Sequence, residues 1–259
     1  MRDKFNGVFI PCIVASSYLF LYIPIIILVL FSFNNAPFPA PWNAFTLQWY
    51  KELFATQEIW DAFYTSLLVS VSATAISLFM AIMLLYHQTY SAKAKDFMLL
   101  FYGNLLIPEI FLAVGLITFL SYFSIPLGLP TLIIGHTLLG LGYTVPIVYT
   151  RFLELDYRLT EASLDLGASP SQTFFKITLP LLYPSLVAAG LLVFILSFDD
   201  FLLSFFCAGS SAQTLSLYIF SMLRSGASPV VNALSTILLM MSSLLVAVFC
   251  WLNIKTRIL

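Results

Sequence analysis

The sequence predicts an all-α integral membrane protein, a single transmembrane domain over residues 1–259. Hydrophobic residues make up 61% of the chain and charged residues only 9%, whereas ordinary globular domains are about 25% charged. Apolar runs of about 20 residues recur along the chain, and each is long enough to cross a hydrocarbon core of about 30 Å. Because these runs use most of the residues, no separate soluble domain is expected.

The apolar runs predict six transmembrane helices, at about 7–32, 63–86, 97–121, 130–150, 183–206 and 231–252. The first run is uncharged from Phe5 to Phe33, which is too long for the apolar part of a secretory signal, so it is expected to remain as a helix. Glycine and proline interrupt the fourth and fifth runs, which makes their ends the hardest to place.

Basic residues indicate the orientation of these helices. With six spans the two ends of the chain share a side, and the opposite loops hold only Lys51 and Arg224. The positive-inside rule makes the more basic side cytoplasmic, and both termini with it. The residues on that side are Arg2, Lys4, Lys93, Lys95, Arg151, Arg158, Lys176, Lys255 and Arg257.

The polar segment at about 151–182 is predicted to form a helix-turn-helix on the cytoplasmic side. Gly167 suits the left-handed position that ends a helix. Ser169-Pro170-Ser171-Gln172 then has serine at the N-cap, proline at N1 and glutamine at N3 of a capping box. The first helix is predicted from an apolar stripe at helical spacing, formed by Leu155, Leu159, Ala162 and Leu166.

Three acidic residues, Glu109, Asp199 and Asp200, lie within predicted spans. A charge at the centre of such a helix costs about 2.5–3.5 kcal/mol, so these residues usually face a bundle interior or a water-filled path. Asp200 shares a helical face with Ser197 and Ser204, consistent with a polar lining. Carboxylates with aromatic neighbours suit an organic polycation. The alternative is that the carboxyl groups only hydrogen-bond neighbouring helices.

Other sequence features argue against other functions. The chain contains no G-x4-G-K-[ST] phosphate loop, so it is not expected to hydrolyse ATP itself. Its net charge of −1 does not favour binding to nucleic acid, which is itself negatively charged. The cysteines lack the spacing of metal ligands or of a disulfide. His136 is expected to have a polar packing role. No histidine is expected near the carboxylates, which argues against an enzyme site.

The spacing of Glu161-Ala162-Ser163, Gly167 and Ile177-Thr178-Leu179-Pro180 resembles the cytoplasmic EAA loop of bacterial ABC-importer permeases. It departs from that pattern at Ser163, where the family has alanine. The resemblance implies that the loop fits a groove in a separate ATPase subunit, which would bind ATP and Mg, and that this chain needs no cofactor. The implied coupling residues are Glu161, Ala162, Ser163, Asp165 and Gly167.

Further segments resemble the second permease subunit of bacterial spermidine/putrescine ABC importers: Tyr22-Ile23-Pro24, Phe31 to Asn34, Trp49-Tyr50, Pro108-Glu109, Leu196 to Asp200 and Ser228 to Leu234. The resemblance implies a type I ABC importer permease in the bacterial inner membrane, surrounded by lipid. It implies a polyamine pathway lined by Glu109, Asp199 and Asp200, with Trp49 near the outer mouth.

The partners that this resemblance implies are an ATPase homodimer, a homologous second permease subunit and a periplasmic polyamine-binding protein. The preference between spermidine and putrescine stays open. One alternative is a permease for another cationic solute. The other is a secondary transporter that uses the carboxylates as proton or sodium sites, which would need no coupling loop.

Overall fold

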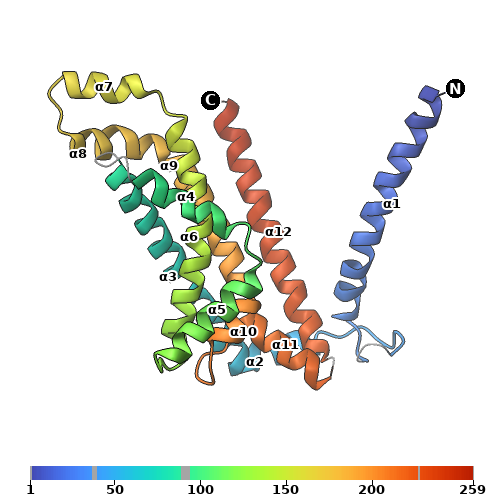
Figure 1. Ribbon diagram of the computed structural model, residues 1–259. Helices are drawn as coiled ribbons and strands as arrows, with labels where there is room; N and C mark the ends of the chain where they lie inside the picture. The colour runs from blue at the N-terminus through green and yellow to red at the C-terminus, as the bar shows by residue number, and fades with distance from the viewer. Residues whose placement is uncertain (1, 37–39, 89–93, 227, 259) are drawn as a thin grey trace. The chain divides into compact units, whose positions relative to one another are not determined.

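A computed structural model describes residues 2–36, 40–88, 94–226 and 228–258 (Figure 1). Side chains are described from residue 10 to residue 244, except at 37–39, 89–97, 99 and 227. Within these ranges the regular structure is helical, with one isolated antiparallel bridge between Asn34 and Phe45. The chain divides into two compact units, Met1–Ile59 with Ile219–Leu259, and Trp60–Tyr218.

Four described helices are long and apolar enough to cross a membrane: Ile10–Phe31, Gln57–Gln88, Leu129–Leu153 and Pro170–Asp199. The apolar helices Glu109–Tyr122 and Pro229–Leu244 are shorter over the residues searched. All six predicted runs therefore contain helix, while the exact number of spans stays a prediction.

The first unit contains α1 (Arg2–Phe31), α2 (Gln48–Ala55) and α12 (Pro229–Ile258), and α12 packs against the other two. The side chains of α1 are largely exposed from Ile10 to Ile27, as expected of a helix that faces lipid. Asn34 organises the loop between α1 and α2, because its side-chain oxygen accepts a hydrogen bond from the Asn43 N–H at 2.9 Å. The Trp49 indole N–H donates to the Asn34 carbonyl at 2.7 Å.

The second unit is built around α6 (Leu129–Leu153), which packs against α4 (Ala94–Asn104), α9 (Leu179–Asp199) and α10 (Leu202–Cys207). Gly140 permits the close approach of α6 to α9, since a Cβ there would lie 2.8 Å from Val193 Cγ1. The remaining elements of this unit are α3 (Gln57–Gln88), α5 (Glu109–Tyr122), α7 (Tyr157–Asp165), α8 (Pro170–Thr173) and the π-helix η1 (Phe174–Thr178), with α11 (Leu215–Ser225) shared between the units.

Two predicted spans are interrupted in the structure. The run predicted at 97–121 forms α4 and α5, because Pro108 takes an extended conformation as the N-cap of α5 and disfavours helix in the residue before it. The run predicted at 183–206 ends as α9 at Asp199, and α10 begins at Leu202. Asp200 between them is extended, with φ −64° and ψ 130°.

The fifth helix also begins earlier than predicted. Helix runs from Pro170 through the π-turn at 174–178 into α9, so the second helix of the predicted helix-turn-helix is continuous with the fifth span. Pro180 follows the π-helical turn at 174–178, and both proline and π-turns are known causes of local distortion in a helix. Within the second unit, α7 and α8 lie at one end and α10 lies near the other (Figure 1).

Candidate functional site

The two helix breaks meet beside α6 at a cavity of about 250 Å³. The break between α4 and α5 contributes Glu109, and the break between α9 and α10 contributes Asp199 and Asp200. Aromatic side chains of Tyr143 and Phe201 also line the cavity. The structure therefore brings together all three acidic residues that the sequence singled out.

The three carboxyl groups differ in their surroundings. Asp199 is exposed, whereas Asp200 is only 8% exposed and Glu109 lies between these extremes. The Asp200 carboxylate accepts hydrogen bonds from the backbone N–H of Ser204 at 2.9 Å and, more weakly, of Leu203 at 3.4 Å. It thus satisfies the first turn of α10, as an N-cap side chain does.

Glu109 lies in the first turn of α5, where its carboxyl group is close enough to that of Asp200 to interact. Its Oε1 atom is buried and has no hydrogen-bond partner among the described residues. A second carboxyl group so near makes an unpaired negative charge on Glu109 unfavourable, and a cation beside Glu109 would offset that cost.

His136 of α6 lies fully buried next to this acidic cavity. Its Nδ1 is 2.9 Å from Ser197 Oγ and its Nε2 is 3.3 Å from Ser204 Oγ. Nε2 also lies 3.6 Å from Asp200 Oδ2. The sequence predicts Ser197 and Ser204 as lining of the pathway. In the structure both serines are buried and contact this histidine.

The expectation that no histidine lies near the carboxylates is wrong. The immediate neighbours of His136 in the sequence do not indicate this contact, because its partners Ser197 and Ser204 lie 61 and 68 residues away in the chain. A usable signal was depth. His136 lies two turns from the outer end of the predicted fourth span, and Asp200 lies in the outer half of the fifth.

The polar segment between α6 and α9 forms a helical hairpin, defined here as residues 156–178 and called the coupling hairpin. Its first helix, α7, ends at Asp165, and the φ of +85° at Gly167 confirms the predicted left-handed position after the helix. The N–H of Gly167 donates to Leu164 O at 2.9 Å, and that of Ala168 donates to Ser163 O at 3.1 Å. This pair of bonds is the Schellman ending of a helix.

The second helix of the coupling hairpin begins with the predicted capping box. Ser169 Oγ accepts from the Gln172 N–H at 3.3 Å, and Gln172 Oε1 accepts from the Ser169 N–H at 2.9 Å. Pro170 occupies the first helical position, as predicted. These local bonds fix where the chain turns and where it resumes a helix.

Two hydroxyl contacts hold the coupling hairpin together and fasten it to the rest of the second unit. Ser163 Oγ of α7 lies 2.9 Å from Thr173 Oγ1 of α8, and both residues are buried. The Tyr86 hydroxyl at the end of α3 lies 2.8 Å from Ser171 Oγ. The Tyr86 ring also contacts Phe174 at a centroid distance of 5.2 Å.

The outer surface of the coupling hairpin presents apolar side chains to solvent. Leu166 is 90% exposed and Leu159 is 47% exposed. Glu161, Ala162 and Asp165 are exposed as well. Three residues of the predicted apolar stripe, Leu159, Ala162 and Leu166, are therefore left uncovered by the described part of the chain, which is typical of a surface that binds another protein. The fourth, Leu155, precedes α7 and packs against the core.

Comparison with known proteins identifies the family. Residues 97–254 match the family described as "Binding-protein-dependent transport system inner membrane component". The chain belongs to this family. It is a permease subunit of an ABC importer, and the predicted all-α permease fold is confirmed.

The relatives of this permease include transport proteins for polyamines. It is 38% identical to the spermidine/putrescine transport system permease protein PotC of Escherichia coli K12, over 88% of each chain. It is 35% identical to the PotC protein of Haemophilus influenzae, over 88% of this chain and 90% of the relative. It is 31% identical to the putrescine transport system permease protein PotI of Escherichia coli K12, over 86% and 82%.

A solved structure supports the fold of the permease. A chain from the crystal structure of a bacterial ABC transporter involved in the import of the acidic polysaccharide alginate matches with a TM-score of 0.70. The match covers 97% of the permease and 96% of that chain, at 14% sequence identity. At this identity the likeness speaks for the fold alone.

Membership of the family assigns the coupling hairpin to the EAA motif of the permease, which works with a binding protein and an ATPase in the inner membrane. Ser163 stands where alanine is usual, and its hydroxyl is used in the contact with Thr173. The departure from the motif is thus accommodated by a hydrogen bond inside the hairpin.

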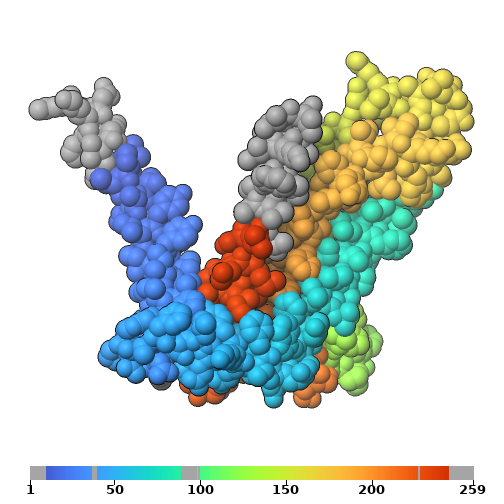
Figure 2. Space-filling model, turned by 180° about the vertical axis from the view of Figure 1, so that it is seen from behind, coloured from blue at the N-terminus to red at the C-terminus, as the bar shows by residue number. Residues whose placement is uncertain are grey.

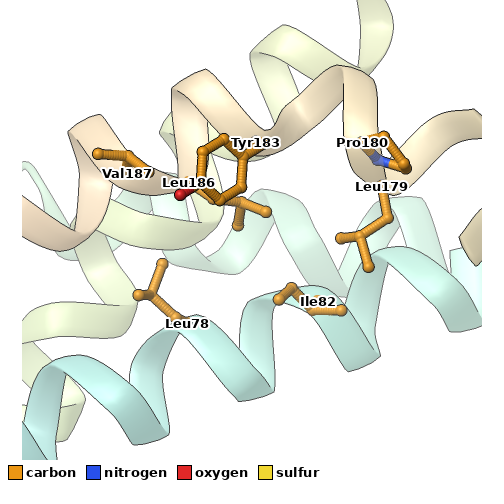
Figure 3. A pocket seen from close by; sticks show the side chains of 7 residues that line it. All are labelled: Leu78, Ile82, Leu179, Pro180, Tyr183, Leu186 and Val187. Carbon is orange, nitrogen blue, oxygen red and sulfur yellow. The ribbon is translucent and has the colours of Figure 1, made fainter.

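A second cavity in the permease has a different character from the acidic one. It is an open groove of about 640 Å³ between α3 and the start of α9, and no charged side chain lines it (Figure 3). Leu78 and Ile82 face Tyr183 and Leu186 across it (Figure 3). Such a lining offers nothing to a hydrophilic solute, so the acidic cavity is the candidate site for a cation.

Proposed function

We propose that this permease forms part of the translocation pathway of an ATP-driven importer for polyamines, spermidine or putrescine, delivered by a periplasmic binding protein. The observation that carries the proposal is the acidic cavity itself, in which Glu109, Asp199 and Asp200 lie together. Among the described side chains, neither lysine nor arginine forms an ion pair with them. The polyamine permeases among the relatives support the same substrate class.

The chemistry of the cavity fits an alkylammonium group better than an anion. Carboxylates attract the ammonium groups, and the faces of Tyr143 and Phe201 can add cation–π contact. Trp49, which belongs to the first unit, is a further proposed contact of the polyamine near the outer mouth of the pathway. Its indole N–H is occupied by Asn34 O, which leaves the ring face as the contacting surface.

We assign the energy source to a partner. The chain lacks a phosphate-binding loop, so ATP and Mg would be bound by an ATPase homodimer and no cofactor by this chain. The exposed face of the coupling hairpin would bind that ATPase through Glu161, Ala162, Asp165 and Leu166. Ser163 and Gly167 would act by shaping the hairpin, since Ser163 is buried and Gly167 forms the turn.

The remaining parts of the assembly are also proposals. A homologous second permease subunit would complete the pathway, and lipid would surround both subunits. The coupling hairpin carries Arg158 and Lys176, which supports a cytoplasmic position for it and for both termini. Of the other basic residues used for orientation, Lys93 and the side chains of Arg2, Lys4, Lys95, Lys255 and Arg257 lie outside the described residues.

Uptake by the reconstituted complex tests the proposal. Proteoliposomes containing the permease, its partner subunit, the ATPase and the binding protein should accumulate labelled spermidine or putrescine only with ATP on the ATPase side. Uptake that persists without ATP, or that dissipates an ion gradient, would favour a secondary transporter. Failure of both polyamines to accumulate, with uptake of a different cation, would favour the permease for another solute.

Two variants test the pathway residues in the same assay. Glu109→Gln and Asp199→Asn each remove a charge with little change of shape, and each should lower uptake at limiting polyamine about tenfold to a hundredfold, because a lost charged contact is worth about 1.5–3 kcal/mol. Glu58→Gln is a matched control, since Glu58 is an exposed acid in the first turn of α3. Unchanged uptake in both pathway variants would contradict the proposed pathway.

A further inference from the structure

The break between α9 and α10 is held by contacts on both of its sides. His136 reaches Ser197 in the last turn of α9 and Ser204 in the first turn of α10. Asp200 lies between these helix ends, and its main-chain carbonyl accepts a hydrogen bond from Ser216 Oγ at 2.6 Å. A single imidazole on α6 therefore bridges the two helix ends where the chain leaves helical conformation.

The far end of α10 is fastened to the same helix. Thr131 Oγ1, one turn and a half before His136 on α6, donates to Cys207 O at 2.8 Å. Both Thr131 and Cys207 are buried. Because α10 is bonded to α6 at its beginning and its end, its position depends on α6 and not only on the chain connection to α9.

Asp199 and Asp200 are neighbours in sequence but occupy different environments. The Asp200 carboxylate is buried, accepts hydrogen bonds from two backbone N–H groups and lies 3.6 Å from His136 Nε2. Asp199 is exposed and lines the cavity that it shares with Glu109. A substrate ammonium can therefore reach Asp199 without displacing any of the bonds that organise α10.

We propose that His136 is a positioning residue for the acidic cavity, and that Asp200 works with it as an internal support while Asp199 and Glu109 contact the transported cation. This inference rests on the proposed polyamine pathway. In it, His136 and Asp200 fix the break so that Asp199 points into the cavity. Asp200 then acts through its hydrogen bonds, whereas Asp199 acts through its charge.

Isosteric variants separate these two roles, because asparagine keeps one acceptor oxygen of aspartate and loses the negative charge. In the reconstituted complex, Asp199→Asn should raise the KM for spermidine about tenfold. Asp200→Asn should stay within about twofold of the parent, since the amide oxygen can still accept the 2.9 Å bond from the Ser204 N–H and only the weaker 3.4 Å bond from Leu203 is lost. Asp200→Ala removes the cap and should raise KM about as much as Asp199→Asn does.

The partnership of His136 with Asp200 is tested by a double variant. His136→Leu removes both hydrogen bonds while it keeps an apolar side chain of similar volume, and it should raise KM by a factor similar to Asp200→Ala. The double variant should be no worse than either single one, because residues that act as a unit are not additive. Should His136→Leu prevent assembly, Ser204→Ala removes one of its contacts and should shift KM in the same direction.

The outcomes distinguish this inference from the function on which it rests. Equal damage from Asp200→Asn and Asp199→Asn would overturn it, since Asp200 would then contact the cation through its charge. Multiplying effects of His136→Leu and Asp200→Ala would also overturn it. A lower yield of complex with an unchanged KM would reduce His136 to a packing role and likewise overturn the inference. If Asp199→Asn and Glu109→Gln both leave KM unchanged, the polyamine pathway itself is wrong.

Discussion

Ser163 replaces the alanine that is usual in the EAA motif, and its hydroxyl oxygen forms a contact inside the coupling hairpin. Its hydroxyl is buried at the contact of α7 with α8 and lies 2.9 Å from the Thr173 hydroxyl. Thr173 also donates to Ser169 O at 3.2 Å, which ties the same hydroxyl to the capping box. A serine at this position therefore connects the two helices of the coupling hairpin through their side chains.

Ser163→Ala should destabilise the coupling hairpin by about 1 kcal/mol, the typical net contribution of one hydrogen bond. The loss is limited because Thr173 keeps its backbone acceptor. Thermal unfolding of the purified complex measures the change as a lower Tm. Thr173→Val serves as the partner variant in a double-mutant cycle, and effects of the two variants that simply add would contradict a direct contact.

The coupling hairpin and the helix breaks differ in how far the sequence could predict them. The capping box at Ser169 and the turn at Gly167 depend on residues within five positions of each other, so local patterns were sufficient. Asp200 also forms a local hydrogen bond to the start of α10. It lies inside an apolar run, however, and hydropathy predicts that run to be one continuous helix. The contact of His136 with Ser197 spans 61 residues, and no local pattern encodes it.

At the turn of the coupling hairpin, Gly167→Ala should cost about 1–2 kcal/mol, because its φ of +85° is left-handed and a side chain is strained there. A Cβ at this position would meet no atom within 4 Å, so the cost belongs to the backbone alone. Gly115→Ala is the matched control, since it also has open space but lies within α5. There alanine should be neutral or stabilising. Equal Tm values for the two variants would show that alanine at position 167 causes no backbone strain.

On the scale of the second unit, one continuous run of helix joins the coupling hairpin to the acidic cavity. It extends over Pro170–Asp199, which at about 1.5 Å per residue is about 45 Å long. The coupling hairpin lies at one end of this unit in both views (Figures 1 and 2). A displacement of the hairpin by the ATPase would therefore be carried along this helix to the residue that precedes its break, Asp199.

Glu161→Ala tests whether the coupling hairpin receives that displacement. Glu161 is exposed on α7 beside Ala162 and contributes to no described ion pair, so its removal should leave the fold of the permease intact. We expect weaker retention of the ATPase during purification of the complex, or ATP hydrolysis without uptake, with a loss of polyamine uptake of about tenfold or more.

Glu154→Ala is the matched control for this variant. Glu154 is also an exposed acid near the coupling hairpin, but it lies outside the EAA motif and pairs with Arg151 at 2.9 Å. Exposed pairs of this kind contribute about 0–1 kcal/mol, so its removal should change neither ATPase retention nor uptake. If Glu161→Ala changes ATPase retention and uptake no more than Glu154→Ala does, the ATPase does not bind α7 through Glu161. The exposed apolar side chain of Leu166 would then be the contact to test.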